Sequence, residues 1–137
     1  MNVEANNKNK LKSAIEKVIK SYDKKSNEKD EILIQAMVTD VKISGVITTN
    51  DKVSGSPYLQ INYSEGNKTD SVTSGIGGSK SFIFYKHSRY RPKIKFINDL
   101  INISLKIEKI TKKEFLDIEF AIDKKNKIHI LQLRRLS

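Results

Sequence analysis

The sequence predicts an α+β protein with a mostly antiparallel sheet flanked by two helices. Short apolar runs rich in branched residues lie between clusters of turn residues, which is typical of strands. Two longer stretches repeat apolar residues at helical spacing. Because the helices flank the strands instead of alternating with them, an antiparallel sheet is favoured over a parallel one. A chain of 137 residues is long enough for one domain.

The two predicted helices lie near the start of the chain and before its last strands. The apolar spacing predicts an amphipathic helix over about 10–23. Pro92 stands where a second helix can begin, and a broad stripe of isoleucine and leucine predicts a buried helix over 93–110. Residues 1–9 are polar and are expected to form a tail, so that 10–137 form a single lobe.

The strand pattern covers most of the remaining sequence. Strands are expected over 32–38, 41–49, 58–63, 71–74, 81–86, 115–122 and 127–134. The first two are expected to form a hairpin that turns near 39–42. Turn clusters separate the middle strands at 51–57 and 64–70, and a glycine loop follows at 75–80.

The last two predicted strands form a hairpin whose register decides which side chains meet. Asn tolerates the positive φ of a tight turn, so Lys125-Asn126 is the expected two-residue turn. One face then holds four polar side chains, the polar quartet: Asp117 opposite Arg134, and Glu119 opposite Gln132. The other face holds Ile118, Phe120, Leu131 and Leu133, as a core face should.

The polar quartet has the chemistry of a metal and phosphate site. The carboxylates of Asp117 and Glu119 are hard oxygen ligands suited to Mg²⁺. The guanidinium of Arg134 offers a planar fork that matches phosphate oxygens. The alternative interpretation is a surface ion pair between Asp117 and Arg134, with Glu119 and Gln132 simply solvated. Spacing alone favours the ion pair over the metal and phosphate site.

Three ordered motifs resemble a known family. LDIEFAI followed by HILQLR resembles the end of the ATP-grasp nucleotide-binding domain of pyruvate phosphate dikinase and phosphoenolpyruvate synthase, with its [Q/L]-D-[I/M]-E-[F/W] and L-Q-x-R strands. ILIQAMVTDVKISGVITT resembles that domain's V-x-V-Q-x-M-V and S-G-V-x-F-T, although Thr48 stands where the aromatic is usual. PYLQINYSEGNKTDSVTSG resembles the stretch before its glycine-containing segment. The resemblance covers roughly 12–135 and is closest to members that phosphorylate small metabolites such as glutamine.

The resemblance implies an ATP- and Mg²⁺-dependent phosphotransferase, a kinase, and assigns roles to individual residues. Asp117 and Glu119 would bind Mg²⁺, and Gln132 would lie beside the metal and the phosphates. Arg134 would grip the γ-phosphate and is the expected catalytic residue. The hinge whose backbone meets the adenine would consist of Gln35, Ala36, Met37 and Val38.

The family's first lobe, which carries a glycine-rich loop, has no counterpart in this sequence, and neither does its phosphohistidine domain. The chain is therefore expected to be the C-terminal lobe of a two-lobed clamp, from a split or truncated enzyme. A separate chain would supply the missing lobe, and the phosphoacceptor would be a small metabolite.

The net charge of +10 favours an anionic partner, although the abundance of Lys, Asn and Ile is also what an AT-rich coding sequence produces. Residues 85–95 interleave aromatic with basic side chains, which is typical either of a nucleic-acid contact or of a solvated connection. A small basic nucleic-acid-binding protein and an inactive remnant are therefore the alternative functions.

Several classes of site are excluded or disfavoured. The chain has no Cys, so it has neither disulfides nor thiolate metal sites. Its two His residues, His87 and His129, are far apart in sequence, which disfavours a His-based zinc site. No signal-peptide core and no membrane-spanning apolar run is present, so the expected location is the cytoplasm.

Overall fold

The computed structural model describes residues 3, 7–22, 30–66 and 79–136. The chain divides into two compact units, Met1–Met37 and Val38–Ser137. The described part of the first unit contains the helix α1 (Lys8–Ser21), which confirms the helix predicted from the apolar spacing. Its amino end is capped by Asn7, whose side-chain oxygen accepts a hydrogen bond from the Lys10 backbone N–H at 3.0 Å.

The prediction of a strand over 32–38 is wrong. This segment has no regular secondary structure, and Leu33, Ile34 and Met37 are exposed. The hairpin predicted to turn near 39–42 is therefore absent, because its first strand does not form. A strand needs a neighbour for its backbone N–H and C=O groups. The strand that follows, β1 (Val41–Thr48), has neighbours on both of its edges and offers this segment no free edge.

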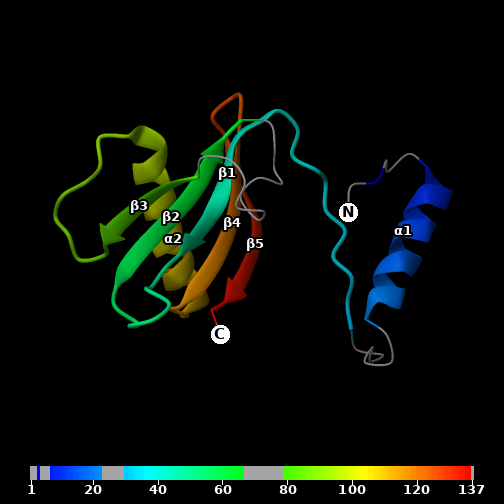
Figure 1. Ribbon diagram of the computed structural model, residues 1–137, viewed down its shortest axis with the longest axis horizontal. Coiled ribbons are helices and arrows are strands. Elements are labelled where there is room, and N and C mark those ends of the chain that lie inside the picture. Colours follow the sequence, from blue (N-terminus) through cyan, green and yellow to red (C-terminus); the bar gives the residue numbers. More distant parts are fainter. Residues whose placement is uncertain (1–2, 4–6, 23–29, 67–78, 137) are drawn as a thin grey trace. The chain divides into compact units, whose positions relative to one another are not determined.

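In the second unit, residues 38–66 and 79–136 form a five-stranded antiparallel sheet and a helix (Figure 1). Its elements are β1 (Val41–Thr48), β2 (Tyr58–Glu65), β3 (Lys80–Tyr85), α2 (Lys95–Thr111), β4 (Leu116–Asp123) and β5 (Ile128–Arg135). The strand order is β3-β2-β1-β4-β5, with antiparallel pairing throughout. The α+β class is confirmed, as are the predicted second helix and the strands beginning at 41, 58, 81, 115 and 127. The strand predicted at 71–74 lies outside the described residues, as does most of the glycine loop.

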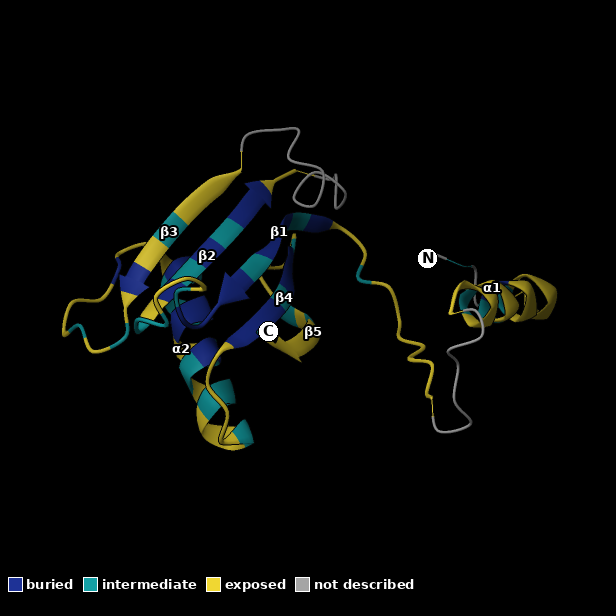
Figure 2. Ribbon diagram, turned by 60° about the horizontal axis from the view of Figure 1, so that its bottom comes forward, coloured by how far each residue is buried: buried dark blue, intermediate teal, exposed yellow. Residues whose placement is uncertain are grey.

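One face of the sheet packs against α2 and forms the core. Figure 2 shows buried residues along β1, β2 and β4. The core consists of Ile43, Ile47, Leu59, Ile61, Tyr63, Phe84, Ile97, Leu100, Ile101, Leu116, Ile118, Phe120 and Ile122. In β1, β2 and β4 these residues lie two or four positions apart, so the residues at the alternate positions face away from α2. Gly45 is required on the core face, because a Cβ there would lie 2.2 Å from the Asn62 carbonyl oxygen.

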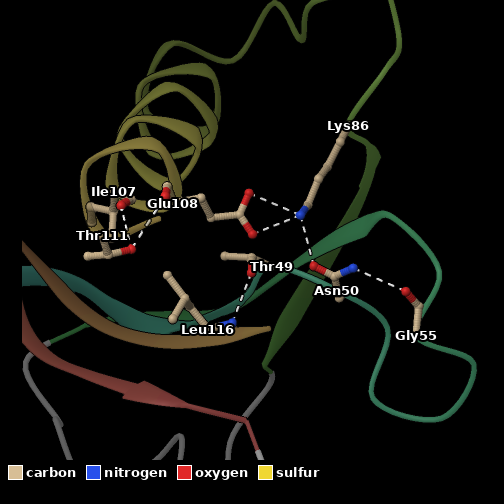
Figure 3. A network of polar contacts seen from close by, with 8 residues as sticks. All are labelled: Thr49, Asn50, Gly55, Lys86, Ile107, Glu108, Thr111 and Leu116. Carbon is tan, nitrogen blue, oxygen red and sulfur yellow. Dashed lines mark hydrogen bonds and ion pairs between the residues drawn. The ribbon is translucent and has the colours of Figure 1, made fainter. Parts of the chain in front are cut away.

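A buried ion pair joins the end of β3 to α2 (Figure 3). The ammonium of Lys86 lies 2.8 and 3.0 Å from the two carboxylate oxygens of Glu108. It also donates to Asn50 Oδ1 at 2.8 Å, and the Asn50 amide donates to the Gly55 carbonyl at 3.1 Å. The side chains of Lys86 and Glu108 are only 9% and 11% exposed. The network therefore fixes the loop after β1 against the helix.

A second polar contact ties the residue after β1 to the start of β4 beside this network (Figure 3). The fully buried Thr49 accepts a hydrogen bond from the Leu116 backbone N–H through Oγ1 at 3.0 Å. The backbone N–H of Thr49 donates to the Leu116 carbonyl at 2.9 Å. Both backbone groups of Leu116 are thus paired where β4 begins. In the part of the chain that the structure describes, neither helix is long and apolar enough to cross a membrane.

Candidate functional site

The register predicted for the polar quartet is confirmed: Asp117 pairs with Arg134, and Glu119 pairs with Gln132. These four residues alternate with the core residues of β4 and their partners on β5, so they lie on the face away from α2. Antiparallel pairing therefore gathers two carboxylates, one amide and one guanidinium from two strands.

The turn that produces this register differs from the predicted two-residue turn. The Asn126 N–H donates to the Asp123 carbonyl at 2.9 Å, and the Asp123 N–H donates to the Lys127 carbonyl at 3.1 Å. Asn126 adopts a φ of 66°, which makes it the left-handed residue of a three-residue loop. Compared with a two-residue turn, such a loop shifts the pairing of β4 with β5 by one residue near the turn.

A bulge further along β5 reverses this shift. Phe120 pairs with Ile130 and Glu119 with Gln132, so Leu131 has no partner on β4. Ile130, and not Leu131, therefore stands opposite Phe120. The extra residue in the turn and the extra residue in the bulge compensate, which restores the predicted pairing at the polar quartet.

The centre of the site is a short ion pair between a buried carboxylate and an exposed guanidinium. Arg134 Nε donates to Asp117 Oδ2 at 2.6 Å, and the Arg134 side chain is 58% exposed. Asp117 is only 3% exposed, and its second oxygen, Oδ1, has no hydrogen-bond partner. The hydrogen bond and charge of Asp117, with a smaller contribution from Glu119, raise the pKa of Arg134.

This geometry agrees only in part with the surface ion-pair alternative. The predicted pair exists, but its carboxylate is buried and keeps an oxygen without a donor. Arg134 binds Asp117 through Nε, and no described residue accepts a hydrogen bond from its two terminal nitrogens. Asp117 Oδ1 can therefore accept a further hydrogen bond, and the two terminal nitrogens of Arg134 can donate further hydrogen bonds.

The neighbouring strands add polar side chains that the sequence interpretation missed. Thr48 on β1 pairs with Asp117, and Gln60 on β2 pairs with Thr48. Side chains of directly paired residues share a face, so both belong to the row that contains Asp117 and Arg134. The alternation of VKISGVITT could have shown that Thr48 faces away from the core. The sequence could not show which strands pair with β1.

The carboxylates available to a cation are few. Over residues 7–22, 30–66 and 79–136, no group of three or more His, Cys, Asp or Glu side chains could hold a metal ion. Asp117 and Glu119 would therefore need further oxygen ligands, from Gln132, from a hydroxyl or from a bound phosphate.

The predicted adenine hinge lies in a segment with no regular secondary structure. Gln35, Ala36 and Met37 belong to the first unit and are exposed, whereas Val38 begins the second unit and is half-buried. The adenine contact expected of these residues stays a prediction.

The basic segment over 85–95 makes several contacts within the protein. Besides the buried Lys86, the Arg91 guanidinium lies 5.3 Å from the centre of the Phe84 ring. Lys95 pairs with Asp99 one helical turn later, at 2.8 Å. These contacts give three of the basic side chains structural roles, and they weaken the argument for a nucleic-acid surface here.

The contacts of the Asp123 carboxylate at the turn are expected to make the free energy of unfolding depend on pH. It interacts with His129 at 2.9 Å and accepts the N–H groups of Lys125 and Lys127. Led by the His129 contact, these interactions lower its pKa below 3.8. Because the folded state then favours the ionised carboxylate, the stabilisation is complete above about pH 4 and is lost as pH falls through the lowered value.

Asp123→Asn should therefore destabilise the protein near pH 6 and have a smaller effect near pH 3. Urea unfolding of both proteins across this range would measure the difference, with Asp99→Asn on α2 as the control. A constant difference between wild type and Asp123→Asn at all pH values would contradict this assignment.

A scan against models of known protein families and a search of curated proteins each find no match to this chain. The resemblance to the ATP-grasp domain therefore depends on the motifs themselves, and the activity that it implies stays a prediction.

Proposed function

We propose that this chain is an ATP- and Mg²⁺-binding lobe of a phosphotransferase, with the polar quartet as its phosphate and metal site. The proposal depends chiefly on Asp117, a buried carboxylate with one oxygen held by Arg134 and the other without a partner. Such an arrangement is costly unless a ligand or water completes it, because buried polar groups are normally hydrogen-bonded. The family resemblance supplies the class of ligand, a nucleoside triphosphate.

Arg134 would be the phosphate-binding side chain. Its Nε–H is fixed by Asp117, which holds the guanidinium plane and limits the side-chain entropy lost on binding. The two terminal nitrogens could then donate to two phosphate oxygens at once. In phosphoryl transfer, such a positioned cation stabilises the charge that develops on the transferred group.

Two features of the polar quartet support a divalent cation in this proposal. Asp117 Oδ1 is a hard oxygen ligand without a donor, and Glu119 lies two residues along the same strand and face. Asp117 and Glu119 would hold the metal, with Gln132 beside it. A bound Mg²⁺ would offset part of the phosphate charge.

A second lobe would complete the site in this proposal. The resemblance implies phosphates gripped from two sides, so affinity for ATP by this lobe alone should be weak. The second lobe would come from a separate chain or from another part of the enzyme, and a small metabolite would accept the phosphoryl group.

Calorimetric titration with Mg-ATP tests the proposal. Asp117→Asn removes the charge with little change of shape, and we expect it to weaken binding by roughly tenfold or more. Asp99→Asn is the matched control, because that carboxylate belongs to an exposed ion pair on α2. Equal binding by all three proteins, or binding by none, would contradict the proposal.

A further inference from the structure

Thr48 on β1 stands directly opposite Asp117 on β4. In an antiparallel sheet, such partners have Cβ atoms roughly 4.5–5.5 Å apart and side chains on the same face. Gln60 lies on the other side of Thr48, and Arg134 on the other side of Asp117. The Thr48 hydroxyl is therefore next to the proposed metal ligand, on the side opposite Arg134.

Both side chains bury an oxygen that has no hydrogen-bond partner. Thr48 is 2% exposed and Asp117 is 3% exposed. The two unpartnered atoms are Thr48 Oγ1 and Asp117 Oδ1. Buried polar atoms in proteins are nearly always paired, so two orphaned oxygens on paired residues indicate a small group that both would bind.

The charges and oxygen atoms of this row of side chains, which runs from Gln60 through Thr48 and Asp117 to Arg134, favour a cation as that group. Asp117 Oδ2 is already occupied by Arg134, which leaves Oδ1 for a second positive partner. Within the polar quartet, the two negative charges of Asp117 and Glu119 exceed the single positive charge of Arg134. A threonine hydroxyl is a known type of Mg²⁺ ligand beside nucleotide phosphates.

We infer that Thr48 Oγ1 is a further ligand of the divalent cation assigned to Asp117. The inference depends on the proposed function and extends it to a third strand of the sheet. Position 48 is also where this sequence departs from the motif that it resembles. An aromatic side chain there would fill the space beside Asp117, whereas threonine supplies an oxygen.

Mn²⁺ binding, measured from the electron paramagnetic resonance signal of free Mn²⁺ with and without ATP, tests this inference. Thr48→Val keeps the branched shape but removes the oxygen, and it should weaken Mn²⁺ binding by roughly tenfold or more. Thr48→Ser should retain most of the affinity. Ser44→Ala is the matched control, because Ser44 is also buried with an unpartnered hydroxyl on β1 but stands opposite Ala121.

The wild-type protein provides a second measurement that needs no variant. Mn²⁺ should broaden the methyl resonance of Thr48 before that of Thr111, whose hydroxyl donates to Ile107 on α2. If wild type and Thr48→Val bind Mn²⁺ equally, or if the Thr48 resonance is unaffected, this inference is wrong while the proposed function stands. If the wild-type protein binds Mn²⁺ neither alone nor with ATP, both this inference and the proposed function are wrong.

Discussion

Glu108→Ala is expected to lower the free energy of unfolding by about 3–5 kcal/mol. The substitution leaves the Lys86 ammonium buried, with the Asn50 side-chain oxygen as its remaining partner. Losing one member of a buried ion pair costs far more than the pair contributes, because the other charge stays desolvated. Urea unfolding followed by circular dichroism would measure the loss.

The exposed pair on α2 is the matched control. Lys95 is 89% exposed beside Asp99, so Asp99→Ala should change stability by less than about 0.5 kcal/mol. Replacing both members of the buried pair, as Lys86→Met with Glu108→Leu, should recover much of the loss from Glu108→Ala. A loss below about 1 kcal/mol for Glu108→Ala would contradict a desolvated pair.

Arg134→Ala is expected to weaken Mg-ATP binding by about 1.5–3 kcal/mol, or roughly ten- to a hundredfold. The proposed reason is the loss of two charge-assisted donors aimed at the phosphates. Arg134→Lys keeps the charge but not the planar fork, so its affinity should lie between wild type and Arg134→Ala. Calorimetric titration would measure all three.

Arg135→Ala is the matched control for this experiment. Arg135 is the next residue of β5 and pairs with the core residue Leu116, so it belongs to the opposite face. Its loss should leave Mg-ATP affinity unchanged. Because Arg134→Ala also removes the partner of Asp117, unfolding curves must show that each variant is folded. Equal losses for both alanine variants would indicate general charge attraction instead of a site.

The C-terminal hairpin shows how far sequence pattern can predict a register. Side chains on a strand alternate between faces, so only pairings that keep Ile118 and Phe120 in the core are acceptable. That requirement fixed Asp117 opposite Arg134 correctly. It did not predict the three-residue turn or the unpaired Leu131, because two compensating irregularities leave the pairing at the far end unchanged.

The segment over 32–38 shows the limit of the same reasoning. Its branched apolar residues are typical of a strand, but a strand forms only where another strand offers a free edge. Pattern within a segment carries no information about that edge. Periodicity also did not indicate that β1 lies between β2 and β4, since β4 comes from a distant part of the chain.

The sequence by itself determined the α+β class, the second helix, the last hairpin and the face shared by the polar quartet, because all of these follow from local periodicity. Only the tertiary structure decided that Asp117 is buried, that Thr48 lies beside it, and that Lys86 pairs with Glu108. Burial and contacts between distant strands depend on how the sheet is assembled. The four residues of the hairpin are thus part of a longer polar row, which extends across β1 to Gln60 on β2.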